Sequence, residues 1–250
     1  MSKVFFINVG ANSSDSSRAR SPIFKDDRFV FVPFSFKNQG ANGLAEYPKA
    51  TRKFIRNMED RSTHCDPDWE NLTYGDNCAN RRAAALRRVK VGDILLFWGM
   101  LWRNEGKSWE SFTGERGWYL LGALRVSQIL EAGHTPKDAT PANAKRAAKN
   151  AHLVDGVVGK GQRIFIGSKR YSQLFRKAVD LQLTQHSGLL FRTIRAANGE
   201  PLRLNGKIPW NSSTRSCRVV WDLERREHTA RARIAQRAIL RKTGYDLLRA

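Results

Sequence analysis

Residues 92–130 read GDILLFWGMLWR, NEGKSWESFTGER and GWYLLGALRVSQIL, two long apolar runs on either side of a polar stretch. The apolar runs, 92–103 and 117–130, consist mostly of Leu, Ile, Phe, Trp and Tyr, which is typical of strands buried on both faces. The stretch 104–116 contains the Asn, Gly and Ser residues that connections favour. We therefore predict two strands joined by a loop, the clearest hairpin-like unit in the sequence.

Further strands and helices are predicted around this hairpin. Apolar runs predict strands at 3–12, at 27–36, where Pro33 would end the strand, at 162–168 and at 217–223. Helical patterns cover about three turns within 77–93, the stretch after Pro141, residues 168–181, and residues 224–244, which would end at Gly244. These elements predict an α+β fold, either a mixed sheet or a small β-barrel, with flanking helices.

The chain of 250 residues is long enough to bury a substantial core. No linker is long enough to divide it into separate folding units. The expected organisation is one α+β domain over residues 1–223, followed by a basic helix over residues 224–250.

The net charge of the chain indicates a polyanionic partner. The sequence has 44 Lys and Arg against 23 Asp and Glu, a formal net charge of +21. Such an excess attracts nucleic acid above all. An anionic membrane is the alternative, but the sequence carries no lipidation signal and no apolar stretch long enough to span a bilayer. We therefore expect nucleic acid, and no membrane, as the partner.

The cysteines indicate a reducing compartment. Cys65, Cys78 and Cys217 are an odd number without CxxC spacing, and no cleavage site follows the apolar start MSKVFFINVG, so we predict a cytoplasmic protein. A zinc site at His64, Cys65 and Cys78 is not expected, because adjacent ligands splay apart and no second pair completes a tetrahedron. We predict no metal site, and no cofactor fingerprint is present, which leaves the cofactor unknown.

An acidic segment, THCDPDWENLTYGDN at residues 63–77, interrupts this basic chain. Its candidate catalytic carboxylates are Asp66, Asp68, Glu70 and Asp76. In a structural interpretation, Asp66 caps a helix that begins at Pro67, and the next acids lie in its first turn. In a functional interpretation, the carboxylates face a pocket, where they accept hydrogen bonds from a base, bind Mg²⁺ or act as a general base. A DNA-binding face retains carboxylates only where they act locally, because they repel phosphates.

The block DPDWENLTYGD, followed by VKVGDILLFWG and WYLLGALRV, resembles the nucleotide modification associated domain 3 (Nmad3) family of phages and bacteria. The resemblance extends to VGANSSD, RSPIF and RFVFVPF near the N-terminus and to IGSKRYSQLFRKAVDL, and it stops near Leu223. It implies association with hypermodified phage DNA bases. The stretch VPFSF departs from the family pattern, because no carboxylate follows its proline, so a role that needs that acid is not implied.

The strands VKVGDILLFWG and GWYLLGALRV are also similar to the strand pair of PUA-like domains, the group of EVE, ASCH and YTH domains. This similarity implies a compact barrel that holds a flipped-out or modified base in an aromatic pocket. The candidate base-binding residues are Trp69, Tyr74, Trp98, Trp102, Trp109 and Trp118. Trp98 and Trp118 alternate with apolar neighbours, so core packing is their alternative role. Trp102 and Trp109 flank the polar loop and are the better candidates for stacking.

Clustered basic side chains are the candidates for phosphate contact. They are Arg81, Arg82, Arg87, Arg88, Lys169, Arg170, Arg226, Arg233, Arg237 and Arg241. The last four lie within roughly 80° of one another on a helix, a stripe suited to a phosphate backbone. The stretch GSKRYS, at a predicted strand-to-helix turn, could also present backbone N–H groups to a phosphate.

Three functions remain open from the sequence. The first is a protein that recognises or processes modified nucleobases in phage or bacterial DNA. The second is a DNA-acting enzyme, a glycosylase, nuclease or base-modifying transferase, that uses the carboxylates at 66–76. The third is a basic RNA-binding or structural protein.

Overall fold

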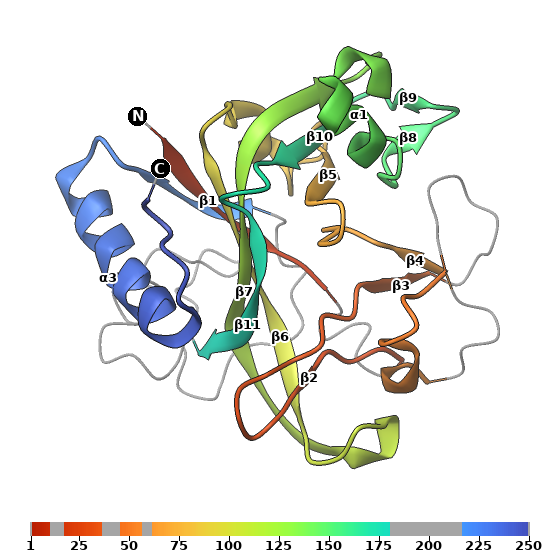
Figure 1. Ribbon diagram of the computed structural model, residues 1–250, viewed down its shortest axis with the longest axis vertical. Helices are drawn as coiled ribbons and strands as arrows, with labels where there is room; N and C mark the ends of the chain where they lie inside the picture. Colours follow the sequence, from red (N-terminus) through yellow and green to blue (C-terminus); the bar gives the residue numbers. More distant parts are fainter. Residues whose placement is uncertain (1, 11–17, 37–45, 57–61, 181–216, 250) are drawn as a thin grey trace.

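The computed structural model describes residues 2–10, 18–36, 46–56, 62–180 and 217–249 (Figure 1). Its strands are β1 (Lys3–Asn8), β2 (Pro22–Ile23), β3 (Phe34–Phe36), β4 (Ser62–His64), β5 (Thr73–Asn77), β6 (Ile94–Asn104), β7 (Phe112–Glu131), β8 (Leu153–Val154), β9 (Val157–Val158), β10 (Gln162–Gly167), β11 (Gln173–Asp180) and β12 (Cys217–Asp222). Its helices are α1 (Pro141–Ala147) and α3 (Arg226–Thr243), with 3-10 turns η1 (Arg52–Phe54), η3 (Ala84–Arg88), η4 (Trp109–Ser111) and η5 (Pro136–Asp138). The predicted α+β class is confirmed.

The predicted hairpin is confirmed as the pair β6 and β7. The two strands run antiparallel from Ile94 opposite Arg125 to Asn104 opposite Phe112. They lie inside an eight-stranded sheet with the order β12-β1-β6-β7-β10-β5, in which β2 also pairs with β6 and β11 with β7. The sheet is mixed, because β1 and β2 run parallel to β6. Over the described residues it does not close, so the mixed-sheet alternative holds rather than the barrel.

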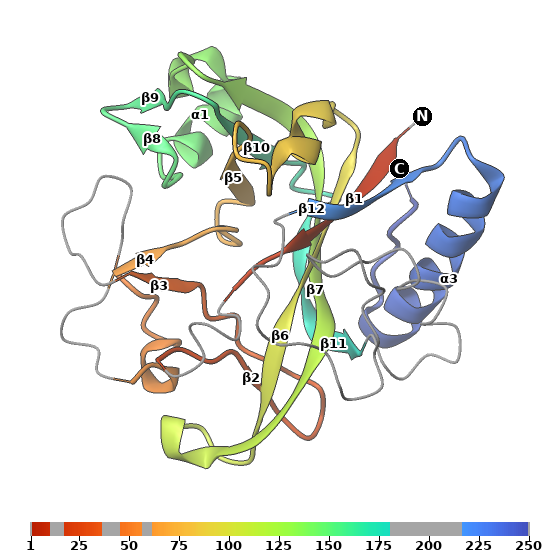
Figure 2. The same cartoon turned by 180° about the vertical axis from the view of Figure 1, so that it is seen from behind.

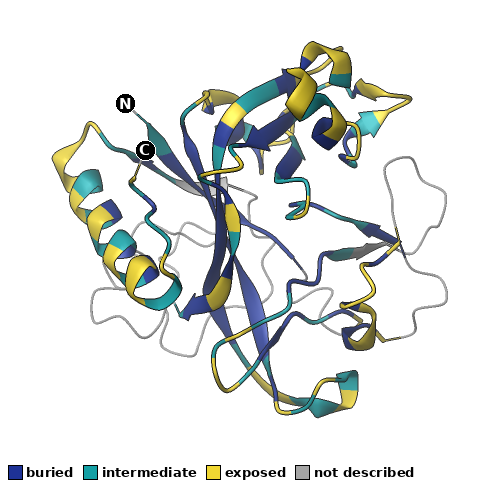
Figure 3. Ribbon diagram, in the orientation of Figure 1, coloured by how far each residue is buried: buried dark blue, intermediate teal, exposed yellow. Residues whose placement is uncertain are grey.

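Both faces of the β6–β7 pair are buried, as the uninterrupted apolar sequence predicts. Trp98 and Met100 pack on one face into a cluster with Trp221 and α3. Phe97 and Leu101 pack on the opposite face with side chains of β1, β5 and β10. Figure 3 shows these central strands as buried and the outer side of α3 as exposed. The sheet is therefore a rigid support for the loops at its edges.

The predicted C-terminal helix is confirmed as α3. It covers one face of the sheet, beside β12 and β11 (Figures 1 and 2). Ala232, Ala235 and Ile239 are fully buried against the core. Gly244 ends the helix with a φ of 73°, a left-handed conformation that glycine adopts without strain. No helix in the described part of the chain combines the length and apolar character that crossing a membrane requires.

Residues 168–181 do not form the predicted helix. Most of them form the strand β11, which pairs antiparallel with the middle of β7. A register shift between Leu174 and Val179 interrupts this pairing. Because of it, the buried side chains of Phe175, Ala178 and Val179 are three and four positions apart, a spacing that imitates one face of a helix. Backbone pairing with β7 therefore stabilises this segment as a strand, although its local sequence has a helical pattern.

Two other predicted elements are shorter in the structure. Only Phe34–Phe36 of the stretch 27–36 is a strand, because the Ser21 hydroxyl satisfies the backbone of Val32, accepting from its N–H at 2.9 Å and donating to its carbonyl at 3.3 Å. The three-turn helix within 77–93 is reduced to η3, and the Arg163 guanidinium donates to carbonyls at its end. The loop predicted at 199–214 lies outside the described residues.

Candidate functional site

The acidic segment forms a tight turn between β4 and β5, so the predicted helix at Pro67 is wrong. The Asp66–Pro67 peptide bond is cis, and Asp68 and Thr73 exchange backbone hydrogen bonds of 2.9 and 3.0 Å. The Asp68 carboxylate accepts the backbone N–H groups of Glu70 and Asn71, both at 3.0 Å. A side chain that bonds its own turn stabilises a loop in place of a helix. Asp68 therefore stabilises this turn, and Asp66 does not cap a helix, because no helix begins at Pro67.

The buried side chain of Arg146, from α1, holds this turn in place. Its guanidinium donates to the carbonyl oxygens of Asn71 at 2.6 Å, Leu72 at 3.2 Å and Gly167 at 2.7 Å. It also donates to the side chain of Asn143 at 2.9 Å. These bonds join α1, β10 and the turn, three segments far apart in the sequence. The part of the turn that leads into β5 is thereby fixed against α1 and the end of β10.

Asp66 is the most deeply buried of the four candidate carboxylates, with 6% of its surface exposed. Both of its oxygens accept the backbone N–H of Gly75, at 3.0 and 2.9 Å. Its Oδ2 lies 2.9 Å from Nε2 of His152. Burial raises the pKa of Asp66 to about 6, although the bonds from His152 and Gly75 act in the opposite direction.

His152 and His64 complete the cluster. The pKa of His152 is lowered by burial but raised by the hydrogen bond and the charge of Asp66, and the net change is upward. The His64 ring meets the His152 ring edge-on, with centroids 4.5 Å apart. Burial and the charge of His152 lower the pKa of His64 to about 4. One ligand atom from each of His64, Asp66 and His152 lies within 4.8 Å of the others, so the three groups could hold a metal ion.

Three neighbours fix the position of the His152 ring. Its Nδ1 lies 3.2 Å from Oε1 of Gln162, and its backbone N–H donates to Asn150 at 3.0 Å. Gly75 leaves the necessary room, because a Cβ at that position would lie only 2.1 Å from Cδ2 of His152. The glycine of the TYGD block is thus required by packing against the histidine.

The other candidate carboxylates are not brought into this cluster. Asp76 accepts the hydroxyl of Tyr74 at 2.7 Å, and Glu70 is exposed. Tyr74 itself is buried and stacks on Phe165, with ring centroids 6.2 Å apart. Its ring therefore has no face open to a base in this conformation. Of the four acids, Asp66 is the one in the cluster with His64 and His152, whereas Asp76 acts on Asp66 and His152 only through its charge.

Most of the candidate tryptophans are core residues. Trp98, Trp102 and Trp118 each have 5% or less of their surface exposed, which fits the core-packing alternative and leaves no open face for stacking. The Trp102 ring lies between the guanidinium groups of Arg20 and Arg116, at 4.5 and 4.7 Å from its centroid. The expected exposed role for Trp102 is therefore wrong in this conformation.

Two candidate tryptophans are half-buried. Trp109 packs against Phe112, with ring centroids 5.6 Å apart, and Trp69 meets Phe97 edge-on at 5.1 Å. Gly122 makes room for Trp69, because a Cβ there would lie 2.5 Å from the indole ring. Trp69 and Trp109 retain some exposed surface, so they stay candidates for base contact.

The ten candidate phosphate contacts are all exposed, in three groups: on η3 and the turn before it, on the turn before β11, and on α3. The stripe on α3 points away from the buried face of that helix, as its spacing predicts. The turn at Lys169 and Arg170 leads into a strand, so the expected helix N-terminus for a phosphate is wrong there. Those two side chains can contribute their own charge, but no helix dipole.

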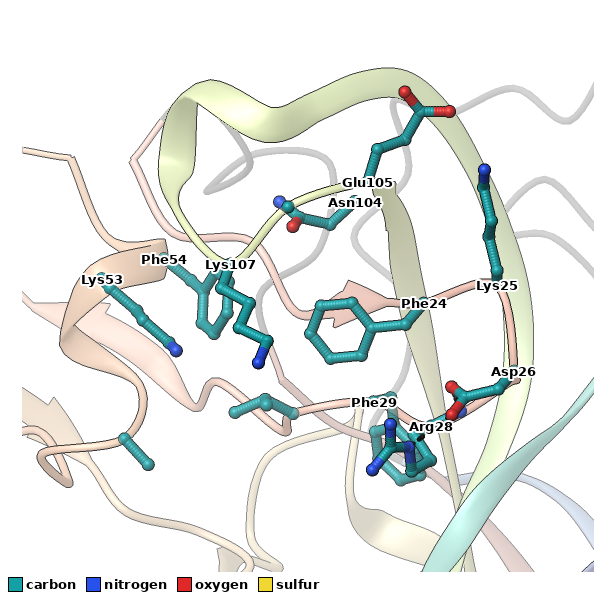
Figure 4. A pocket seen from close by; sticks show the side chains of 13 residues that line it. Phe24, Lys25, Asp26, Arg28, Phe29, Lys53, Phe54, Asn104, Glu105 and Lys107 are labelled. Carbon is teal, nitrogen blue, oxygen red and sulfur yellow. Dashed lines mark hydrogen bonds and ion pairs between the residues drawn. The ribbon is translucent and has the colours of Figure 1, made fainter.

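A groove with an aromatic lining lies between residues 24–30, the η1 region and the connection between β6 and β7 (Figure 4). Phe24, Phe29 and Phe54 line it, and its volume is about 740 Å³. Its charged lining residues are Lys25, Asp26, Arg28, Lys53, Glu105 and Lys107, for a net charge of +2. In Figure 4 the side chains of Lys53 and Lys107, from η1 and the β6–β7 connection, end beside the Phe54 ring. Aromatic rings with cations around them suit a planar anionic ligand.

One family model matches residues 3–228, that of nucleotide modification associated domain 3. The chain belongs to the Nmad3 family. The match covers the whole β-sheet and the first residues of α3, and it confirms the family that the sequence motifs resemble. No curated protein and no solved structure matches the chain. The family name connects this Nmad3 domain with nucleotide modification and specifies no reaction.

The sequence analysis missed the partners of Asp66 in this Nmad3 domain. His152 is 86 positions away, in a stretch without a recognisable histidine motif. His64 and Asp66 are separated by one residue, and this H-x-D spacing was the available signal, because alternate residues of an extended segment face the same side. The groove was missed as well, because its phenylalanines and lysines come from three separate segments.

Proposed function

We propose that this Nmad3 domain binds nucleic acid and recognises or processes a modified base, which it holds in the aromatic groove. The groove is the observation that carries the proposal. Its volume of about 740 Å³ lies within the range of small-ligand sites, and the base of a nucleotide would lie against Phe24 and Phe29. Stacking of a base on an aromatic ring contributes about 1–3 kcal/mol.

The charges around the groove support an anionic ligand. Lys53 lies over the Phe54 ring, with its ammonium nitrogen 5.3 Å from the ring centroid. Over the described residues, no carboxylate forms an ion pair with Lys53 or Lys107. Arg28, in contrast, is paired with Asp26. The two lysines therefore have their full charge available for phosphate groups.

The test is the fluorescence anisotropy of a labelled single strand across a salt series. Replacing Lys53 and Lys107 together by Ala should reduce the slope of log affinity against log salt by about 1.4, since each phosphate contact to a single strand contributes about 0.7. Lys145→Ala, on the exposed side of α1, is the matched control and should change the slope far less. An equal reduction of the slope by Lys145→Ala would show that any surface lysine contributes alike to strand binding, and it would refute a phosphate site at the groove.

The preference for a modified base is measured separately. Hypermodified and unmodified phage duplexes of the same length are compared as competitors, because a base must leave the helix to enter such a groove. Phe24→Leu keeps the groove apolar but removes a π-face, and it should weaken binding by roughly fivefold to 150-fold. Equal affinity for RNA, unmodified DNA and modified DNA would instead favour the basic RNA-binding or structural protein.

An enzyme is the second candidate, and the buried cluster of His64, Asp66 and His152 favours it. Polar groups with strongly shifted pKa values gather at functional sites more often than elsewhere. The test is mass spectrometry of the nucleosides after incubation with hypermodified phage DNA. A new nucleoside that falls by about 10²-fold or more in Asp66→Asn, with DNA affinity retained, would establish catalysis. An unchanged nucleoside profile would leave recognition as the function.

A further inference from the structure

The cluster of His64, Asp66 and His152 has the composition of a metal site. Two imidazoles and one carboxylate converge from the end of β4, the turn after it and the connection between α1 and β8. Their ligand atoms all lie within 4.8 Å of one another. Two histidines with one carboxylate are a donor set that transition metals use in proteins. The groove residues discussed above take no part in this cluster.

The hydrogen bonds of His152 leave its Nε2 facing an acceptor. Nδ1 lies 3.2 Å from the side-chain amide oxygen Oε1 of Gln162, and Nε2 lies 2.9 Å from Oδ2 of Asp66. Both neighbours are oxygen acceptors, whereas a neutral imidazole has only one N–H. When Nδ1 donates to Gln162, the lone pair of Nε2 and that of Oδ2 point at the same place. In that tautomer a proton or a metal ion lies between them, whereas in the other tautomer the Nε2–H of His152 donates to Asp66.

The surroundings hold the ligands in the orientation that a metal requires. Metal-binding histidines typically donate their second N–H to an oxygen acceptor, as His152 does with Gln162. The Gly75 N–H fixes the carboxylate of Asp66 through both oxygens. His64 is in ring contact with His152, and two adjacent imidazolium ions would repel each other. His64 presents a ring nitrogen within 4.8 Å of the ligand atoms of Asp66 and His152.

We propose that Nε2 of His152, Oδ2 of Asp66 and a ring nitrogen of His64 bind a divalent first-row transition metal ion. With bonds of about 2.1 Å, neighbouring ligand atoms lie about 3.0–3.4 Å apart. The pair Asp66–His152 has nearly this separation already, at 2.9 Å, and a ring nitrogen of His64, which lies within 4.8 Å of both, would move closer to bind the same ion. Three protein ligands leave a position for water or substrate, as in catalytic sites. The imidazole ligands favour Zn²⁺ or Fe²⁺ over Mg²⁺ and Ca²⁺.

The test is a titration of the full chain, purified without a histidine tag and treated with a chelator. Co²⁺ is the probe, because its visible absorption bands report ligand number and geometry, and Zn²⁺ is then added to displace it. One equivalent of Co²⁺ should bind to the native protein. Asp66→Asn and His152→Gln should remove the absorption bands, whereas His134→Gln, an exposed histidine after β7, is the matched control and should keep them.

Gln162 positions His152 and is not itself a proposed ligand, so substituting it tests the site with all three ligands in place. Gln162→Leu should lower the Co²⁺ affinity by about 10–100-fold, and Gln162→Glu, which restores an oxygen acceptor, should recover it. The absence of a Co²⁺ spectrum in the native protein would overturn the proposal, as would equal binding by Asp66→Asn. An NMR spectrum with both ring nitrogens of His152 protonated in the presence of excess Zn²⁺ would assign the central charge to a proton.

The outcome is independent of the proposed nucleic-acid function. Strand binding in the groove is measured in the presence of a chelator, where a metal site at His64, Asp66 and His152 is emptied. If the native protein binds the strand but no Co²⁺, the metal site alone is refuted. Loss of the salt-dependent strand binding with a normal Co²⁺ spectrum refutes the groove alone.

Discussion

The substitution Gly75→Ala tests the packing of the cluster with a single methyl group. The added Cβ would lie 2.1 Å from Cδ2 and 2.6 Å from Cγ of His152, and 2.9 Å from Oδ1 of Asn150. Ordinary contacts of a Cβ are longer than 3.4 Å. The imidazole ring would therefore have to move by about 1 Å or more, which its two hydrogen bonds oppose.

The expected cost follows from what that movement breaks. Overpacking a tight core costs about 1–3 kcal/mol. Separating a buried charged pair costs about 3–5 kcal/mol, because Asp66 would be left buried without its partner. We expect the free energy of unfolding to fall by about 4 kcal/mol, a large part of the total for a protein of this size.

The sign of the change in the free energy of unfolding shows whether the added methyl group meets the His152 ring. Gly75 lies in β5, and it is not among the glycines with a positive φ. In a strand without steric conflict, replacing Gly by Ala stabilises by about 0.5–1 kcal/mol, because the unfolded chain loses freedom. The assay is equilibrium unfolding in urea followed by tryptophan fluorescence. A stability equal to or above that of the native protein would refute the described position of His152.

A double-mutant cycle with His152→Ala isolates the clash. Removal of the imidazole is destabilising in itself, since it leaves Asp66 unpaired. In that background, however, Gly75→Ala should cost less than about 1 kcal/mol, because Asn150 is the one remaining neighbour closer than 3 Å. Equal costs in the two backgrounds would place the origin of the destabilisation elsewhere.

Three further predictions concern the surroundings of the cluster and the basic surface. Arg146→Met should lower the free energy of unfolding by about 3 kcal/mol, because it leaves buried carbonyl oxygens unpaired. The midpoint of thermal unfolding should then fall by about 6–12 °C, and a fall under about 2 °C would contradict the anchoring role of Arg146. Burial and the charges of nearby acids raise the pKa of Cys65 to about 12. Alkylation of Cys65 at pH 8, measured by peptide mapping, should therefore be about 10³-fold slower in the folded protein than in urea, and similar rates would contradict its burial. Replacing Arg233 and Arg237 by Ala should reduce the salt slope of duplex binding by about 1.8 without changing stability, and an unchanged slope would remove α3 from the interface.

The core of the fold could be predicted from the sequence because two apolar runs on either side of a polar stretch fit few structures. An apolar run as long as 94–102 that is not long enough for a membrane must be a central strand or a buried helix, and the polar connection after it selects a hairpin. The C-terminal helix was equally determined, by a helical pattern followed by Gly244. Residues 168–181 were predicted wrongly, because a register shift in β11 reproduces the apolar spacing of a helix.

The candidate site could be predicted only in part, since its partners are distant in the sequence. The TYGD block and Asp66 were identified correctly as unusual, but Asp-Pro fits a helix start as well as a turn with a cis bond. The contact that decides the matter, between Asp66 and His152, spans 86 positions. No local pattern encodes such a contact. Trp98 and Trp118 take the core-packing alternative for a related reason, because their burial depends on α3 and Trp221 packing over them.

The position of the acids explains how a basic chain tolerates an acidic segment. Hydrogen bonds from backbone N–H groups, an imidazole or a phenol stabilise the ionised forms of Asp66, Asp68 and Asp76 within the fold. Glu70 is exposed and adds one negative charge to a surface dominated by arginine and lysine. A buried carboxylate beside two histidines is still costly in free energy, and an apolar pair of the same shape would often be as stable. Stability alone does not account for this arrangement, which is the physical reason to look for its function in chemistry or in metal binding.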